Sequence, residues 1–348
     1  MRVALVGLGD IGLSAHLPAL QKHPAIELVQ LIDPNPTRRA AVAGLGIPAT
    51  ADFNPSAVVG GEWIEGPEAG SRGGALGGAR GAEAGPLAVD GVVLATPPWI
   101  TPQLTIDCVR AGLFVLAEKP VATSVDAAGV YGELSADERG RVQVGLTYRH
   151  DPAIGQLATW IVDGTLGETV LVRAHIYDEA FRPDDTEHTA RITATLEHGP
   201  PVVHEGAHVF DWLTYLLNGQ PTVEDAWAVH TRPGLPAPNL TGARLAYPGG
   251  HQALVEFGWF TGALPRCELT VLGDRGLAVL DGFGFDLTLT TAEGEKVVRF
   301  PGDRMTRCFD RQLDRFVALY NGTRAAEPSL DDGLAALHTA QLIAGKTT

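Results

Sequence analysis

Over its first 150 residues the chain alternates short apolar runs with amphipathic stretches. The apolar runs have the length of buried strands and lie at 2–6, 27–32, 89–96, 113–117 and 142–147. The stretches with helical periodicity lie between them, at 12–23, 36–44, 101–111 and 124–138. Regular alternation of strand and helix predicts an α/β domain built on a parallel, doubly wound sheet.

The second half has a different pattern. After a helix expected at 152–163, strand-like segments follow at 170–178, 222–230, 242–247, 251–260, 266–272, 276–281, 285–291 and 295–300. Helices are expected at 206–218, 305–321 and 330–344. This order predicts an α+β domain with a large, mostly antiparallel open sheet. Because an open sheet face is commonly buried against a second copy, we expect a homodimer or homotetramer.

The predicted domain boundary follows from this change. Residues 1–121 form the nucleotide-binding domain, with the last strand and helix of 122–150 packed on it, and 151–348 form the second domain, whose C-terminal helix packs back. Glycine and alanine dominate about 54–86, which is typical of a flexible insertion. The alternative is a mobile lid carrying Trp63.

Composition excludes several partners. The formal net charge of −15 repels a phosphate backbone, so we expect no nucleic-acid partner. Cys108, Cys267 and Cys308 are far apart in sequence and show no metal-ligand spacing, which favours a reducing cytoplasm. The sequence shows neither a secretory signal nor an apolar run long enough to cross a membrane.

The strongest motif is Gly7-Leu8-Gly9-Asp10-Ile11-Gly12, which joins the first strand to the first helix. In this setting it is typical of dinucleotide binding: Gly7 permits the turn, Gly9 lets a pyrophosphate approach, and Gly12 lets the helix pack on the strand. The alternative is a glycine-rich turn of another α/β protein. Residues Gly7, Gly9, Asp10, Ile11 and Gly12 are therefore candidate cofactor contacts.

Asp33 ends the second strand, 21 residues after Gly12. A carboxylate at this place binds the ribose hydroxyls and repels a 2′-phosphate, so it favours NAD. Arg38 or Arg39 could instead reach a 2′-phosphate, which leaves NADP possible. Further candidate cofactor contacts follow later strands, namely Thr96, Pro97, Pro98, Glu118 and Lys119. Trp99 could wall the nicotinamide and substrate pocket, or fill the core.

Lys119 is the first candidate catalytic residue, since it ends a parallel strand and is held between Glu118 and Pro120. We expect partial desolvation to lower its pKa towards neutrality, so that it takes a proton from a substrate hydroxyl. The alternative is a surface lysine in a salt bridge.

His204, His208 and Asp211 form a second group, because spacings of four and three place them on one helix face. Such side chains can serve as acid/base and hydroxyl-binding groups, or as helix-start residues satisfied by capping bonds. The same letters include H-E-x-x-H, the zinc-hydrolase pattern. The two prolines before His204 and the internal Gly206 disfavour the mid-helix zinc site, so no metal is predicted.

Arg149 and His150 follow the last strand of the nucleotide domain and are candidate substrate contacts at the domain junction, or parts of a solvated linker. The segment 178–200 is polar and unpatterned and is interpreted as a specificity loop, with Arg182 and Arg191 as candidate contacts.

These motifs, in this order, resemble the Gfo/Idh/MocA oxidoreductases, such as glucose–fructose oxidoreductase and inositol dehydrogenase. The resemblance rests on the glycine fingerprint and four later motifs: Ala95-Thr96-Pro97-Pro98, Glu118-Lys119-Pro120, Gly206-Ala207-His208-Val209-Phe210-Asp211 and Pro328-Ser329-Leu330-Asp331-Asp332-Gly333. It implies NAD(P)-dependent oxidation or reduction of sugars, cyclitols or their derivatives. It also places the family's catalytic lysine on Lys119 and its active-site histidine on His208.

One position departs from the family pattern. Many members have an aspartate four residues before the active-site histidine, whereas this chain has His204. Two hypotheses therefore stand. The first is an NAD(P)-dependent dehydrogenase of a polyhydroxylated small molecule, in which Lys119 shuttles the proton and His208 orients the substrate. The second is a catalytically weak NAD-binding sensor of the same fold.

Overall fold

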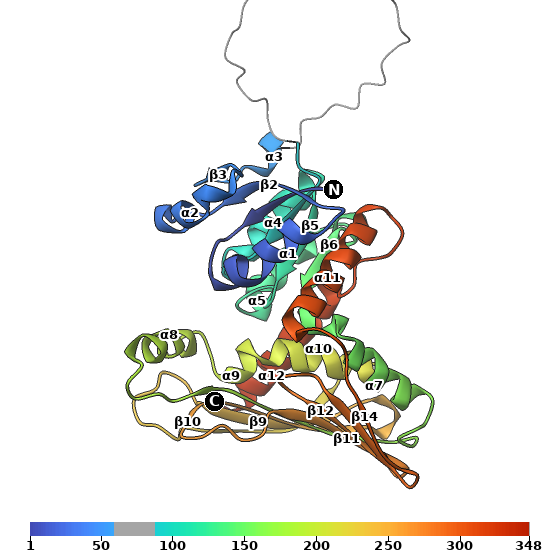
Figure 1. Ribbon diagram of the computed structural model, residues 1–348. Coiled ribbons are helices and arrows are strands. Elements are labelled where there is room, and N and C mark those ends of the chain that lie inside the picture. The colour runs from blue at the N-terminus through green and yellow to red at the C-terminus, as the bar shows by residue number, and fades with distance from the viewer. Residues whose placement is uncertain (59–87, 348) are drawn as a thin grey trace, which may run out of the picture.

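The computed structural model describes residues 1–58 and 88–347, and in this part the chain forms two sheets (Figure 1). The predicted insertion at about 54–86, with Trp63, lies almost wholly outside the described residues. Just before the gap, a short helix, α3, covers Pro55–Val58.

The first sheet has six parallel strands within the described residues, in the order β3-β2-β1-β4-β5-β6. Their bounds are β1 Arg2–Val6, β2 Glu27–Ile32, β3 Ala49–Thr50, β4 Gly91–Leu94, β5 Phe114–Glu118 and β6 Val142–Gly145. The chain runs outward from β1 to β3 and then returns to the other side of β1 at β4. This reversal leaves a crevice beyond the carboxyl ends of β1 and β4, where such sheets bind ligands. The predicted doubly wound sheet is confirmed.

Helices surround this sheet. They are a π-helical turn η1 (Gly12–His16) leading into α1 (Leu17–Lys22), then α2 (Pro36–Val42), α4 (Thr101–Arg110), α5 (Val125–Ala128) and α6 (Ala136–Arg139). The single helix expected at 124–138 is wrong, because a 3-10 segment at Gly129–Glu133 separates α5 from α6. Ser124 caps α5 and Ser135 forms a capping box with Glu138, so the sequence starts a helix twice.

The second sheet has the order β14-β13-β12-β11-β7-β10-β9-β8. Its strands are β7 Leu171–Ala180, β8 Thr222–Val229, β9 Leu240–Ala246, β10 Gln252–Thr261, β11 Glu268–Leu272, β12 Gly276–Asp281, β13 Leu287–Thr291 and β14 Gly294–Val298. Only β7 and β10 pair in parallel among the described strands of this sheet. The mostly antiparallel sheet predicted for this half is confirmed.

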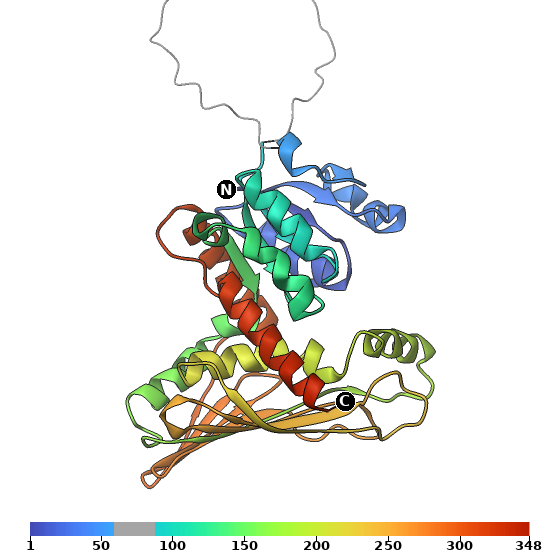
Figure 2. The same ribbon diagram turned by 180° about the vertical axis from the view of Figure 1, so that it is seen from behind.

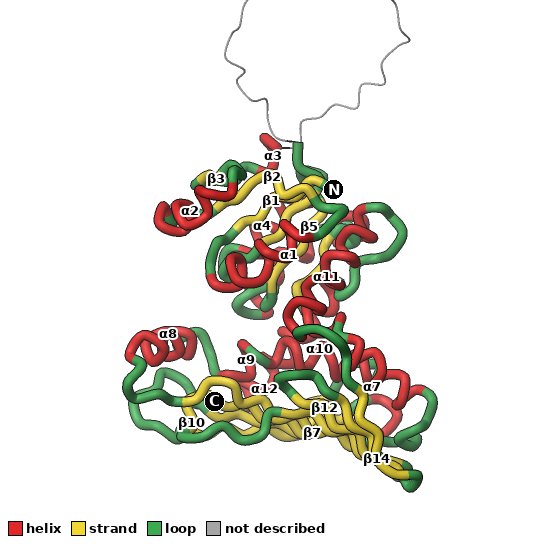
Figure 3. Tube along the Cα trace, in the orientation of Figure 1, coloured by secondary structure: helices red, strands yellow, loops and turns green. Residues whose placement is uncertain are grey.

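In the described part of the chain, helices lie on one face of this sheet and leave the other open (Figures 2 and 3). They are α7 (Pro152–Val162), α9 (Pro201–His204), α10 (Gly206–Leu216) and α12 (Leu330–Lys346). Strand residues such as Val255 and Phe257 pack with Phe210 and Leu213 of α10 in one buried cluster. This cluster fixes α9 and α10 under the nucleotide domain.

The polar segment 178–200 is not a plain loop. Asp185 caps a helix, α8 (Thr186–Leu196), whose buried Ile192 and Leu196 pack with Trp259 and Phe260. The expectation of an unpatterned loop is wrong here, because the two apolar residues four apart already form a narrow helical stripe.

Two C-terminal helices join the halves. In α11 (Arg304–Tyr320), Phe309, Leu313 and Phe316 pack into the same cluster as Leu5 and Leu31 of the nucleotide sheet. Helix α12 contributes to both sides, with Leu330 and Leu337 in a nucleotide-domain cluster and Ala336, Ala340 and Ile343 in that of the second sheet.

Candidate active site

The glycine loop between β1 and η1 packs closely at two of its glycines and is open at the third. Gly7 has φ +97°, and a Cβ there would lie 2.2 Å from the carbonyl oxygen of Ala95. A Cβ on Gly12 would lie 2.1 Å from the Gly7 carbonyl oxygen, so only glycine permits this approach of helix and strand. A Cβ on Gly9 would meet nothing nearer than Arg38 Nη1 at 3.9 Å. The turn expected at Gly7 and the close helix packing expected at Gly12 are both present, and the space beside Gly9 is open.

Asp33, which follows β2, is hydrogen-bonded to the glycine loop. Its carboxylate accepts hydrogen bonds from Leu8 N at 2.8 Å and Asn35 N at 2.7 Å, and Arg38 Nη1 lies 3.4 Å away. Burial acts to raise the pKa of Asp33, but the two backbone hydrogen bonds and Arg38 outweigh it and hold the pKa below its usual value. Asp33 is therefore an anion at neutral pH.

A cavity of about 350 Å³ lies beyond the carboxyl ends of the nucleotide strands. We name it the lysine cavity, and its lining comprises Ile11, Ala95, Thr96, Glu118, Lys119, Gly145, Thr147, Tyr148, Glu205, His208, Met305 and Phe309. It brings together five residues singled out from the sequence, namely Ile11, Thr96, Glu118, Lys119 and His208. Asp10 lies outside this lining and is exposed.

Lys119 projects from the end of β5 towards the break between α9 and α10. Its Nζ donates a hydrogen bond to the carbonyl oxygen of His204 at 3.2 Å and lies 3.8 Å from Oε1 of Glu205. Desolvation acts to lower the pKa of Lys119, but Glu205, Glu118, Tyr148 and Asp178 outweigh it and raise the pKa. The expectation of a lowered pKa is wrong, because burial is offset by neighbouring anions. Lys119 is an ammonium at neutral pH.

Two carboxylates of the site were missed from sequence. Glu205 and His208 also line a smaller cavity of about 90 Å³, next to Asp178 of β7. Desolvation and the Glu205 charge raise the pKa of Asp178 to about 7, although Trp259 Nε1 donates a hydrogen bond to it at 2.8 Å. In the sequence Glu205 stands out only within the H-E-x-x-H pattern, and Asp178 only by its place at the end of an expected strand.

His208 lies at the junction of the two cavities. Its ring centroid is 4.6 Å from that of Tyr148, and its buried Nδ1 has no hydrogen-bond partner in the described chain. Burial, with Lys119 and Arg304 nearby, holds the pKa of His208 well below its usual value. His208 is therefore a neutral imidazole in the free protein.

His204 points elsewhere. Its Nε2 lies 3.2 Å from the carbonyl oxygen of Gly199, and its ring stacks on Trp259 at 5.3 Å. Together with Pro98 and Trp99 it lines a separate cavity of about 320 Å³. Trp99 is 61% exposed and is therefore not core filler. Pro97 takes no part in either cavity lining; its carbonyl oxygen accepts a hydrogen bond from Thr101 Oγ1 at 3.1 Å.

His204 and His208 thus have separate surroundings. The helical stretch is broken at Glu205, between α9 and α10. Within residues 1–58 and 88–347, no group of three or more histidine, cysteine, aspartate or glutamate side chains is placed to hold a metal ion.

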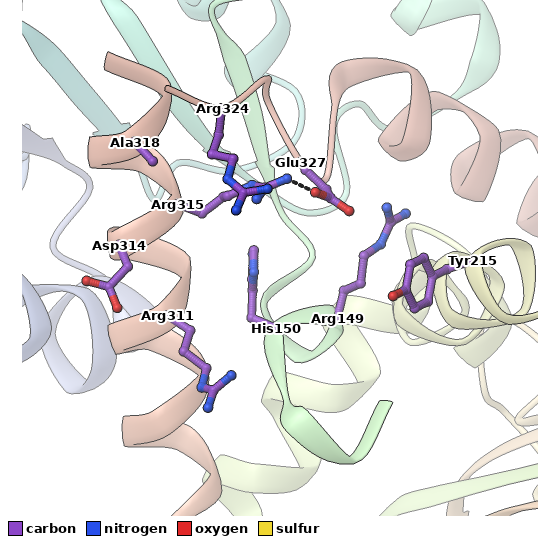
Figure 4. Close-up of a pocket in the computed structure, with 9 residues that line it drawn as sticks. All are labelled: Arg149, His150, Tyr215, Arg311, Asp314, Arg315, Ala318, Arg324 and Glu327. Atoms are coloured by element: carbon purple, nitrogen blue, oxygen red, sulfur yellow. Dashed lines mark ion pairs between the residues drawn. The ribbon is translucent and has the colours of Figure 1, made fainter. Parts of the chain in front are cut away.

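Arg149, His150 and Asp211 do not line the lysine cavity. The guanidinium of Arg149 pairs with the Asp211 carboxylate through two hydrogen bonds, one of them Nε to Oδ2 at 2.9 Å, and both side chains are buried. Arg149 and His150 instead line another cavity, on α11 (Figure 4). The structure therefore gives Asp211 a structural partner in place of the expected substrate.

This fold and site define an oxidoreductase with a dinucleotide-binding domain. The oxidoreductase family with an NAD-binding Rossmann fold matches residues 1–146, and the GFO/IDH/MocA C-terminal domain matches residues 154–279. The chain belongs to the Gfo/Idh/MocA family of NAD-binding oxidoreductases. The resemblance noted from the sequence is confirmed.

Curated relatives are about a quarter identical to this chain over the aligned residues. Rhizopine catabolism protein MocA of Rhizobium meliloti is 27% identical over 64% of this chain and 58% of that protein. Inositol 2-dehydrogenase 1 of Saccharopolyspora erythraea is 28% identical over 74% of each. The chain therefore spans between half and three quarters of the length of these two proteins.

Solved structures share the whole fold. An oxidoreductase from Agrobacterium radiobacter in complex with NAD+, L-tartaric acid and magnesium has a TM-score of 0.78 at 16% identity, covering 99% of this chain and 96% of that one. The WlbA dehydrogenase from Bordetella pertussis, in complex with NADH and UDP-GlcNAcA, has a TM-score of 0.76 at 20% identity, covering 99% of this chain and 95% of that one.

No described helix is long and apolar enough to cross a bilayer.

Proposed function

We propose that this protein is an NAD-dependent dehydrogenase of a polyhydroxylated small molecule, either a sugar, a cyclitol or a sugar-derived acid. The observation that carries the proposal is the lysine cavity, in which the Lys119 ammonium stands between carboxylates at the crevice of the nucleotide sheet. The names of the curated relatives, several of them inositol 2-dehydrogenases, support this substrate class.

The residues present fit a dinucleotide. The open space beside Gly9 admits a pyrophosphate, and the anionic Asp33 favours a free ribose hydroxyl over a 2′-phosphate, so we expect NAD rather than NADP. We assign Gly7, Gly9, Gly12 and Asp33 to the adenosine diphosphate half. When bound, NAD supplies the acceptor for the hydride.

The side chains of the lysine cavity divide the proton chemistry between them. The Lys119 ammonium donates a hydrogen bond to the substrate oxygen and stabilises negative charge that develops on it. His208, which is neutral, accepts the hydroxyl proton in oxidation and returns it in reduction. Glu205 holds Lys119 in its charged form. This division replaces the expected base role of Lys119, since an ammonium cannot accept a proton.

The setting of the enzyme completes the proposal. We propose that the open face of the second sheet, which exposes Leu254, Leu272 and Val297, joins copies of the chain into a homodimer or homotetramer. We further propose a cytoplasmic enzyme with no nucleic-acid or membrane partner, in line with the net charge of −15 and the three buried free cysteines.

The test is turnover by the purified chain. The protein is incubated with NAD or NADP and a panel of inositols, sugars and sugar acids, and reduced-cofactor absorbance is followed. We expect NAD-dependent turnover on part of the panel, loss of about 100-fold or more in kcat/KM for Lys119→Ala, and unchanged turnover for the exposed control Lys296→Ala. Turnover that survives Lys119→Ala overturns the proposal.

A further inference from the structure

A second cavity has a lining that shares no residue with that of the lysine cavity. It has a volume of about 340 Å³ and is formed by η4 (Thr147–His150), α10, α11 and the segment that joins α11 to α12 (Figure 4). We name it the arginine cavity, because its lining includes four arginines, Arg149, Arg311, Arg315 and Arg324, together with His150 and two carboxylates, Asp314 and Glu327. None of these residues serves the reaction proposed above.

The positive groups of this cavity are only partly paired. Arg149 is neutralised by Asp211 and Asp332, and Arg315 pairs with Glu327. Arg311 and Arg324 have no side-chain partner in the described parts of the chain, 1–58 and 88–347. Such a cluster is unusual in a chain whose formal net charge is −15.

A buried nitrogen faces the same group. Nε2 of His150 is buried and has no hydrogen-bond partner within the described residues. A buried polar atom without a partner costs stability, and a bound ligand is one of the explanations for it. In Figure 4 the His150 ring lies at the centre of the group, with Arg149 to its right, Arg311 to its lower left and Arg315 above it.

The arginines repel one another and the histidine. Burial, followed by the charges of Arg149, Arg315 and Arg311, lowers the pKa of His150 to about 4. Burial and Arg324 likewise lower the pKa of Arg315. Because like charges gathered at one place are unfavourable, an anion bound between them would relieve the repulsion.

The arginine cavity is separate from the lysine cavity. Within η4, Thr147 and Tyr148 line the lysine cavity, whereas Arg149 and His150 line the arginine cavity. Helix α11 divides in the same way, since Phe309 faces the lysine cavity while Arg311 and Arg315 face the other. A ligand in the arginine cavity therefore does not occupy the place of the substrate.

We propose that the arginine cavity binds a small phosphorylated ligand through its phosphoryl oxygens. Guanidinium groups present paired N–H donors that match phosphoryl oxygens, which is why arginine is favoured where such oxyanions are bound. The volume of the cavity lies within the range of small-molecule sites. Arg311 and Arg324, the two arginines without carboxylate partners, keep their guanidinium donors free for the ligand, and Tyr215 closes one side.

Inorganic pyrophosphate is the probe, and calorimetric titration at low ionic strength is the measurement. NAD is kept at saturation so that the glycine loop cannot take up the probe. We expect binding by the wild-type chain, weaker binding as NaCl is added, and affinity reduced about tenfold or more in the double variant Arg311→Gln, Arg324→Gln. Both residues are exposed, so we expect this variant to fold, and its thermal melting checks that it does.

The controls identify the site and the ligand class. The variant Arg299→Gln removes an exposed arginine of the second sheet's edge region and should bind pyrophosphate as the wild type does. Citrate, a tricarboxylate without phosphoryl groups, should bind more weakly than pyrophosphate. The proposal is overturned by absence of pyrophosphate binding, by equal binding in the double variant, or by tighter binding of citrate.

Discussion

Lys119 Nζ lies 3.8 Å from Oε1 of Glu205, the residue that directly follows His204. A carboxylate thus lies next to Lys119, although position 204 holds a histidine in place of the aspartate that the family resemblance implies. The break between α9 and α10 makes this possible, since it presents the carbonyl oxygen of His204 and the side chain of Glu205 to the same ammonium.

Removing this carboxylate should weaken catalysis and shift its pH dependence. Because Glu205 raises the pKa of Lys119, Glu205→Gln should lower that pKa, and the alkaline limb of the kcat/KM profile should move to lower pH. We expect kcat/KM to fall about 100-fold at neutral pH. Glu205→Asp should retain part of the activity, and the exposed control Glu197→Gln all of it. An alkaline limb that stays in place in Glu205→Gln would contradict this role.

Asp178 should give the enzyme an ionisation near neutrality. With its pKa raised to about 7, Asp178 loses its proton as the pH rises from 6 to 8, and the new charge, in the same small cavity as His208, favours the imidazolium that forms when His208 takes the hydroxyl proton. Wild-type kcat/KM for oxidation should therefore rise through this interval. Asp178→Asn should abolish the inflection in the pH profile. Since Asp178 and Glu205 interact, the observed value belongs to the pair. The same inflection in Asp178→Asn would exclude Asp178 as its source.

Substitutions at two glycines of the loop should have different effects on the stability of the protein and on its affinity for NAD. An alanine methyl at position 9 has room, so Gly9→Ala should keep its unfolding free energy within about 0.5 kcal/mol and yet bind NAD about tenfold more weakly or worse, because the pyrophosphate is kept away. Gly12→Ala places a methyl against the Gly7 carbonyl oxygen and should lose about 1–3 kcal/mol. Urea denaturation and NAD titration distinguish the two, and equal losses of stability would refute the distinction.

The buried pair of Arg149 and Asp211 should matter for stability. Asp211→Asn leaves a buried guanidinium with only Asp332, at 3.1 Å, as its anionic partner. We expect the free energy of unfolding to fall by about 3 kcal/mol. The matched control Asp331→Asn removes an exposed partner of Arg139 and should change it by less than about 1 kcal/mol. Denaturant unfolding of both variants gives the comparison.

The nucleotide domain could be predicted from the sequence because its signals are local. Strand length, the glycine spacing and the acid after β2 each depend on neighbouring residues, and Lys119 was found from its place at a strand end. The helix over 186–196 left a weaker local signal, in the Asp185 cap and the spacing of Ile192 and Leu196, which the many polar residues around it obscured.

The rest of the site depends on contacts between distant segments. Nothing near Arg149 in sequence indicates that Asp211, rather than a substrate, takes up its guanidinium. The charged state of Lys119 likewise depends on Glu205 and Asp178, which come from two other parts of the chain. Position in the sequence placed these side chains near a cleft but did not decide which cavity each one faces.

Helix α11 belongs in sequence to the second half, yet Phe309, Leu313 and Phe316 fill the interior of the first. A fragment that ends after β6 would therefore leave exposed the apolar surface that α11 covers. We expect such a fragment to aggregate rather than to fold and bind the cofactor by itself. Unfolding by heat or denaturant should then be a single cooperative transition, without an intermediate in which only one domain is folded.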